Sequence, residues 1–165
     1  RLASSIRGLC LRSISEAVVV LDPVALGGLQ RLDIQNCKIV QIKLDWEYRE
    51  IRELLATGSL GFKHLSNVSI TSLEGPKDLT WLLFAKNLRF LTVRHSSSIE
   101  ELVDFRGATI ADLRKLESLE VTNPYALKTP LNPLDLPNLR RYVVKIVKNL
   151  PLSFQQMSMN DGSRG

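Results

Sequence analysis

Apolar residues recur along the chain with one fixed spacing. An aliphatic residue is followed by a second apolar residue three positions later and by a third two positions beyond that. Alternate residues of a strand face the same side, so the last two apolar positions of each run share one face of the predicted strand. The six runs are Ile6-Leu9-Leu11, Leu29-Leu32-Ile34, Leu65-Val68-Ile70, Leu88-Leu91-Val93, Leu116-Leu119-Val121 and Leu139-Tyr142-Val144. The pattern predicts short strands centred on Leu9, Leu32, Val68, Leu91, Leu119 and Tyr142.

Successive runs begin 23, 36, 23, 28 and 23 residues apart. A repeated L-x-x-L-x-L unit with a period in the twenties is typical of a leucine-rich-repeat solenoid. A single repeat cannot bury its apolar face alone, so neighbouring repeats stack and share one core. We therefore expect an α/β fold, with a curved parallel sheet of about six short strands. The prolines between the runs favour loops and short 3-10 turns on the convex side. These are Pro76, Pro124, Pro130, Pro133 and Pro137.

The longest interval between runs contains a segment with helical spacing. Trp46, Ile51, Leu54 and Leu55 share one helical face, and Gly58 follows as a residue that favours helix ends. We expect an inserted helix near residues 46–56. We assign residues 1–152 to one leucine-rich-repeat domain and residues 153–165 to a flexible polar tail.

The positions between the apolar residues of each predicted strand point to the opposite, concave face. They are mostly polar or charged, and Phe90 is the one large apolar residue among them. A polar face with a single aromatic side chain suits protein recognition, and it equally suits an ordinary solvated sheet face. The candidate binding residues on this face are Arg31, Asp33, Asn67, Phe90, Thr92, Arg94, Glu120 and Arg141.

Composition narrows the possible functions. The net charge of +5 is modest, and no dense run of Lys and Arg indicates a nucleic-acid site. There are two cysteines. Cys37 falls where such repeats turn a side chain inward, and Cys10 lies on the opposite side of its strand. We therefore expect two free thiols in a reducing compartment, with no disulfide.

No group of residues suggests catalysis or metal binding. His64 and His95 lack acidic or thiol neighbours at ligand spacing, and the segment 58–63 lacks the spacing of a phosphate-binding loop. We expect no catalytic, cofactor or metal site. The longest apolar run, residues 17–21, is too short to cross a membrane. The chain starts at Arg1, close to its first repeat, which we interpret as a piece of a longer protein.

Several phrases of the sequence resemble one protein family. They are Asp78-Leu79-Thr80-Trp81-Leu82-Leu83-Phe84-Ala85, Asn87-Leu88, Leu91-Thr92-Val93, Ile99-Glu100-Glu101-Leu102, Leu136-Pro137-Asn138-Leu139 and Asn149-Leu150-Pro151-Leu152. Together they resemble the leucine-rich repeats of plant disease-resistance proteins of the coiled-coil, nucleotide-binding, leucine-rich-repeat class. Lys86 stands where the family's phrase has proline.

The resemblance implies a non-catalytic module of a cytoplasmic plant immune receptor. It implies protein partners: the receptor's own nucleotide-binding domain, which the module would restrain, and a pathogen effector or a guarded host protein. ADP or ATP and any membrane association belong to receptor domains outside this sequence. The alternative is the substrate-recognition region of a ubiquitin-ligase adaptor, which would require an F-box segment.

Overall fold

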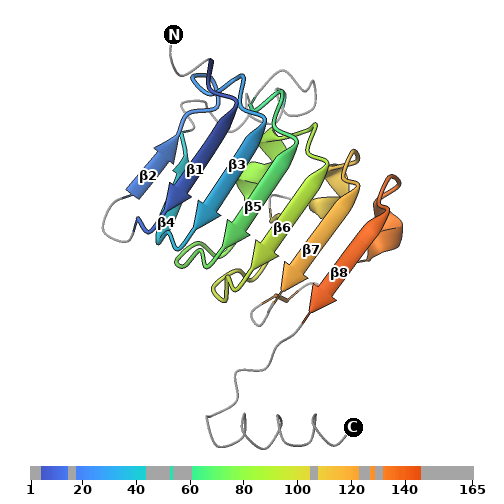
Figure 1. Cartoon of the computed structure of the whole chain (residues 1–165). Coiled ribbons are helices and arrows are strands. Elements are labelled where there is room, and N and C mark those ends of the chain that lie inside the picture. Colours follow the sequence, from blue (N-terminus) through green and yellow to red (C-terminus); the bar gives the residue numbers. More distant parts are fainter. Residues whose placement is uncertain are drawn as a thin grey trace, which may run out of the picture.

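The computed structural model describes residues 5–14, 18–43, 53, 61–104, 108–122, 127–128 and 132–145. Six strands form one parallel sheet in the order β1-β3-β5-β6-β7-β8, in which the neighbours follow the order of the repeats (Figure 1). The strands are β1 (Gly8–Arg12), β3 (Arg31–Gln35), β5 (Asn67–Thr71), β6 (Phe90–Arg94), β7 (Ser118–Thr122) and β8 (Arg141–Lys145).

The strand register places equivalent repeat positions side by side. The central residues Leu9, Leu32, Val68, Leu91, Leu119 and Tyr142 form one continuous row across the sheet. In β3, β5 and β6 the second and fourth residues are buried, while the residues between them are partly exposed. This confirms the predicted strands, their parallel pairing and the side of each strand that faces the core.

The two outermost strands bury their core positions less completely. Leu9 and Leu11 of β1, and Tyr142 of β8, are only partly buried against the core. Val144 of β8 is 41% exposed. Each outer strand has one neighbour in the sheet instead of two, so its apolar side chains are covered from one side only.

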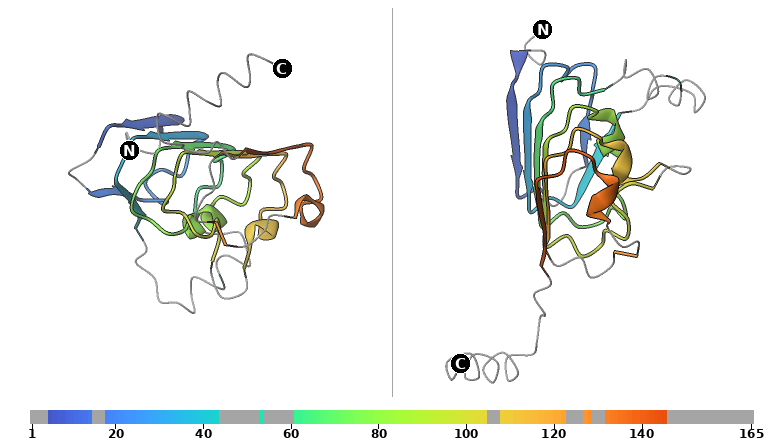
Figure 2. Two further views of the ribbon diagram at one scale, coloured as in Figure 1. Left: turned by 90° about the horizontal axis from the view of Figure 1, so that it is seen from below. Right: turned by 90° about the vertical axis from the view of Figure 1, so that its right-hand side faces the viewer.

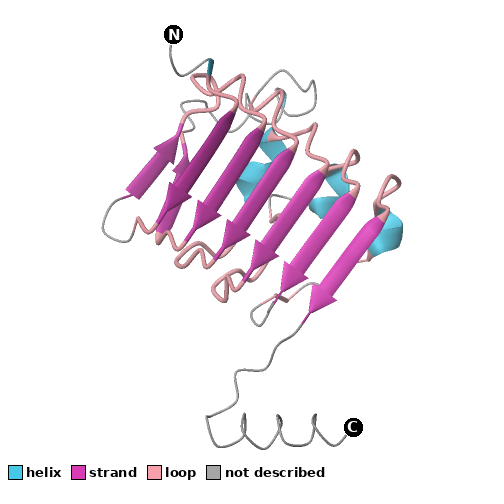
Figure 3. Ribbon diagram, viewed as in Figure 1, coloured by secondary structure: helices cyan, strands magenta, loops and turns pink. Residues whose placement is uncertain are grey.

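Short 3-10 helices cover one face of the sheet (Figures 2 and 3). They are η2 (Thr80–Phe84), η3 (Ile110–Asp112) and η4 (Pro133–Asp135). Side-chain oxygens cap the N-terminal ends of η3 and η4. Thr109 accepts from the N–H of Ala111, and Asn132 accepts from the N–H of Leu134. The prediction of 3-10 turns on this side is confirmed. The expected helix near 46–56 and the tail 153–165 lie outside the described residues, apart from Glu53, which is helical.

A second, two-stranded parallel sheet lies on the same side as the 3-10 helices (Figure 2). It pairs β2 (Val18–Leu21) with β4 (Ile39–Ile42). These two strands were not predicted from the sequence, because each is a short segment outside the L-x-x-L-x-L unit. Leu21 and Val40 are buried in the shared core, so this sheet extends the core behind the first repeats.

The four described turns that leave the main sheet, after β1, β3, β5 and β6, use the same backbone conformation. Ser13, Asn36, Ser72 and His95 have φ angles of 53–55°, and each donates its N–H to the last strand residue of the next repeat. The residue after each turn points inward. Cys37 is buried and unpaired, and its thiol lies 3.6 Å from the carbonyl oxygen of Leu11. Cys10 is exposed and free, so both predictions about the thiols are confirmed.

Candidate functional site

The face of the main sheet opposite the 3-10 helices is not covered by any described segment (Figure 2). We call it the open face. The register arranges its side chains in three rows, which run across the strands. The first row is Gly8, Arg31, Asn67, Phe90, Ser118 and Arg141, the second is Cys10, Asp33, Ser69, Thr92, Glu120 and Val143, and the third is Arg12, Gln35, Thr71, Arg94, Thr122 and Lys145. All eight candidate binding residues therefore share this face.

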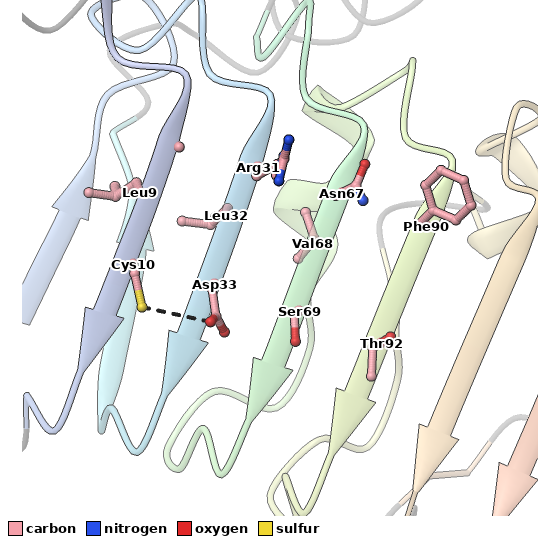
Figure 4. Close-up of a pocket in the computed structure, with 11 residues that line it drawn as sticks. Leu9, Cys10, Arg31, Leu32, Asp33, Asn67, Val68, Ser69, Phe90 and Thr92 are labelled. Atoms are coloured by element: carbon pink, nitrogen blue, oxygen red, sulfur yellow. Dashed lines mark hydrogen bonds between the residues drawn. The ribbon is translucent and has the colours of Figure 1, made fainter.

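Five of the eight candidates line one shallow groove over β1, β3, β5 and β6 (Figure 4). Its volume is about 430 Å³. The five residues are Arg31, Asp33, Asn67, Phe90 and Thr92. Gly8, Cys10 and Ser69 also line the groove and were not among the candidates. Gly8 leaves the groove open at β1, because no other group lies within 4 Å of where its side chain would begin.

Phe90 forms the aromatic wall of this groove. Its side chain is 38% exposed. The guanidinium of Arg89 lies 5.3 Å from the centre of the ring and also contacts Glu117, with 2.7 Å between Nε and Oε2. These two contacts hold the side chain of Arg89 over one part of the ring, and the remaining ring surface faces the groove.

Asp33 contributes a carboxylate at the centre of the groove. Its Oδ2 accepts a hydrogen bond of 2.8 Å from Gln35 and a longer one, 3.7 Å, from the thiol of Cys10. Its Oδ1 is buried and has no hydrogen-bond partner among the described residues. An unsatisfied buried acceptor costs roughly 1–3 kcal/mol. Arg31, in the adjacent row, makes no side-chain hydrogen bond or ion pair with any described residue.

The other three candidates, Arg94, Glu120 and Arg141, form a separate cluster over β6, β7 and β8. The Nη2 of Arg94 lies 3.0 Å from both carboxylate oxygens of Glu120, and the Nη1 of Arg141 lies 3.6 Å from Oε2. The side chain of Glu120 is only 9% exposed, whereas those of the two arginines are about half exposed. The hydrogen bond from Arg94 lowers the pKa of Glu120, against the raising effect of burial.

This shift predicts a pH dependence of folding stability. Because the pKa of Glu120 is lower in the folded chain than its ordinary value of 4.5, ionised Glu120 stabilises the fold at neutral pH. That contribution is present above pH 4.5 and is lost as the pH falls through the lowered, folded-state pKa. Glu120→Gln should therefore remove part of the acid-induced loss of stability. Urea unfolding between pH 3 and pH 7 measures this, and parallel profiles for the two proteins would contradict it.

Comparison with known proteins shows which proteins the chain is related to. The chain is 50% identical to the probable disease resistance protein At1g15890 of Arabidopsis thaliana over 161 residues, which cover 92% of the chain. It is 45% identical to the probable disease resistance protein At1g51480 over 97% of the chain, and 36% identical to the disease resistance protein RPS5 over 68% of it, both from the same plant. The chain belongs to the family of plant disease-resistance proteins.

The segment spans about one fifth of the length of these relatives, 19% of At1g15890 and 20% of At1g51480. No family model matches the chain, and no solved structure matches it. Within the described residues, no helix is both long and apolar enough to cross a membrane. Nor do any three His, Cys, Asp or Glu side chains in that part of the chain lie together in a way that could hold a metal ion.

The sequence motif that most specifically resembles disease-resistance proteins, residues 78–85, has a packing role in this structure. Leu82, Leu83 and Phe84 of η2 are buried in the core. Trp81 is partly buried, and its ring meets the buried ring of Phe62 edge to face, at 6.4 Å between centres and 72° between planes. This part of the family sequence therefore lies on the covered side of the sheet, away from the open face.

Proposed function

We propose that this segment is a leucine-rich-repeat module that acts by binding proteins, without catalysis, in a cytoplasmic plant immune receptor. In this role it restrains the receptor's nucleotide-binding domain and senses a pathogen effector or a host protein. The similarity to disease-resistance proteins supports the role in defence. A shift between a resting and an active state requires partners that bind the two states with different affinity.

The observation that carries this proposal is the exposed aromatic groove of the open face. Phe90 offers apolar surface, while Arg31 has unused donors on the same row of the sheet. The carboxylate of Asp33, two residues after Arg31 in β3, also lines the groove and offers an acceptor. A partner with an apolar side chain, an acidic group and an N–H or hydroxyl donor would satisfy all three. Contact with Phe90 would provide most of the affinity, because buried aromatic residues dominate such interfaces.

Arg94 has a different role in this proposal from Arg31. Its guanidinium is already bound to Glu120, so an acidic partner would have to compete with a carboxylate of the chain itself. We therefore place the focus of recognition at Phe90 and Arg31, in the groove, and assign Arg94 and Arg141 to the edge of the binding surface.

Substitution of Phe90 and Arg31 in the full-length receptor tests the proposal. Phe90→Ala with Arg31→Gln should change signalling by severalfold, because the pair supplies the central contacts. Raised resting activity would indicate lost restraint, and a weaker response to the pathogen would indicate lost recognition. Either result supports a binding role for the open face.

Leu134→Ala is the matched control. Leu134 is 89% exposed, but it lies on η4, on the covered side of the sheet. Its substitution also removes an exposed apolar side chain, and it should leave signalling unchanged. Thermal unfolding of each variant checks that the fold is intact. If the Phe90 and Arg31 variant shows normal resting activity and a normal response, the open face has no role in signalling.

A further inference from the structure

Three consecutive repeats carry a cation at the same position. Lys63, Lys86 and Arg114 each lie two residues before the leucine that begins the apolar run of their repeat. Those repeats contain β5, β6 and β7, which are neighbours in the sheet. Adjacent strands are about 4.8 Å apart, so the three residues form a row roughly 10 Å long on the rim where the strands begin. We call this row the cation ladder.

Hydrogen bonds between repeats fix the backbone of this rim. The side-chain amide of Asn87 donates to the carbonyl oxygen of Lys63, and its Oδ1 accepts from the ammonium of Lys115. Two repeats later, the amide of Asn138 donates to the carbonyl oxygen of Arg114, at 2.8 Å. Two of the three ladder residues are thus tied to the next repeat. The spacing of the ladder is set before any partner binds, which lowers the entropy lost on binding.

The ladder side chains are not neutralised within the described structure. Lys63 and Arg114 are exposed and Lys86 is half-buried, and none of the three makes an ion pair or a side-chain hydrogen bond with a described residue. Like charges on neighbouring strands repel one another and destabilise the arrangement. Bound anions would remove that repulsion.

The described loops at the two ends of the strands also differ in charge, and the excess of cations lies at the end where the ladder is. The loops that lead into the strands contain seven Lys and Arg residues among those described and two acidic residues, Asp22 and Glu117. The described loops that follow the strands are nearly balanced, with five acidic residues (Glu74, Asp78, Glu100, Glu101 and Asp104) and four lysines (Lys38, Lys43, Lys77 and Lys128). This division favours an acidic partner at the ladder rim and directs such a partner toward it.

We propose that the cation ladder is a second binding site, separate from the open face, and that it binds an acidic peptide segment of a partner protein. The length of the row matches about three residues of an extended chain. Lysine and arginine side chains are long enough to reach carboxylates that alternate along such a segment. A duplex nucleic acid or a membrane would extend well beyond the row, and stable membrane attachment uses clusters of four to eight cations.

The test uses the 165-residue chain and a dye-labelled peptide of six glutamates, with binding followed by fluorescence anisotropy. A peptide of six glutamines should not bind. The variant with Lys63→Gln, Lys86→Gln and Arg114→Gln should bind the glutamate peptide at least about tenfold more weakly, since each exposed ion pair contributes a fraction of a kcal/mol. Raising the salt concentration from 50 to 300 mM should remove most of the difference between the two proteins.

The matched control changes Arg12, Lys38 and Lys145 to glutamine. All three are exposed and lie outside the ladder, so the control lowers the net charge by the same amount. It should weaken binding less than twofold. An equal loss in both variants would show that net charge alone attracts the peptide and would overturn the proposal.

Two further measurements address other occupants of the ladder. One is binding to phosphatidylserine vesicles, and the other is sedimentation of the chain alone. Vesicle binding that depends on the ladder, in the absence of peptide binding, would make it a membrane site and would overturn the proposal. Self-association that depends on the ladder, again without peptide binding, would identify the acidic loops of a second copy as its partner and would also overturn it.

Discussion

Gly61→Ala should lower the free energy of unfolding by about 3 kcal/mol, because the new methyl group has no room and the backbone is strained. Gly61 has a φ angle of 100°, a conformation that side chains other than glycine rarely adopt. An added Cβ would lie 2.7 Å from the Cβ of Phe84 and even closer to the carbonyl oxygen of that residue. The same carbonyl accepts a hydrogen bond from Phe62, so it cannot move away without breaking that bond.

The consequences of this clash extend into the core. Phe62 and Phe84 are both buried, and Phe62 contacts Trp81. A shift of the Phe84 backbone would therefore disturb the packing between η2 and the sheet. Urea unfolding of the wild-type and Gly61→Ala chains, followed by circular dichroism, measures the difference.

Gly8→Ala is the control for this substitution. Gly8 lies in β1, has open space where its Cβ would be, and should tolerate alanine with a change of less than about 0.5 kcal/mol. If Gly61→Ala and Gly8→Ala unfold at the same urea concentration, the contact with Phe84 does not constrain the fold.

The six strands could be predicted from sequence because the repeats constrain them twice. The L-x-x-L-x-L spacing fixes which residues face the core, and stacking of equal units fixes the register, so that Leu32, Val68 and Leu91 had to align. The β2–β4 sheet lacks this double constraint. Residues 18–21 are apolar and residues 39–42 are apolar apart from Gln41, and such short segments do not by themselves distinguish a strand from a buried loop.

The candidate surface was predictable as a set of residues but not as two separate groups. The strand register predicts which residues lie directly opposite one another on adjacent strands, and it places Arg94 beside Thr122 and Arg141 beside Ser118. The ion pairs form with the diagonal neighbour, Glu120. Long side chains reach both direct and diagonal positions, so the choice depends on rotamers and burial that the sequence pattern does not contain. The same holds for Arg89, which precedes its strand and turns back over Phe90.

The cation ladder could have been found from the repeat alignment, since its three residues occupy one repeat position. The alignment of apolar positions directs attention to the strands, however, and the ladder lies in the turns before them. What the sequence could not show is that Asn87 and Asn138 tie those turns together. Side-chain amides bond many groups in loops, and only the folded geometry shows which carbonyl each one reaches.

Leu91→Ala should lower the free energy of unfolding by about 2–5 kcal/mol, the cost of deleting a buried leucine side chain and leaving a cavity. Leu91 lies at the centre of β6, between β5 and β7, and is only 1% exposed. Its neighbours in the register, Val68 and Leu119, are buried and held by their own repeats. They cannot move far enough to fill the space.

Phe90→Ala provides the comparison, because Phe90 precedes Leu91 in the same strand and points to the open face. It should cost less than about 1 kcal/mol, from lost strand propensity and the lost contact with Arg89. Chemical unfolding of both variants measures the two costs, and signalling by the full-length receptor measures their functional effects. If recognition belongs to the open face, Phe90→Ala alters signalling while the fold stays intact, whereas Leu91→Ala acts through lost stability. Equal losses of stability would show that the two sides of β6 are not divided between binding and packing.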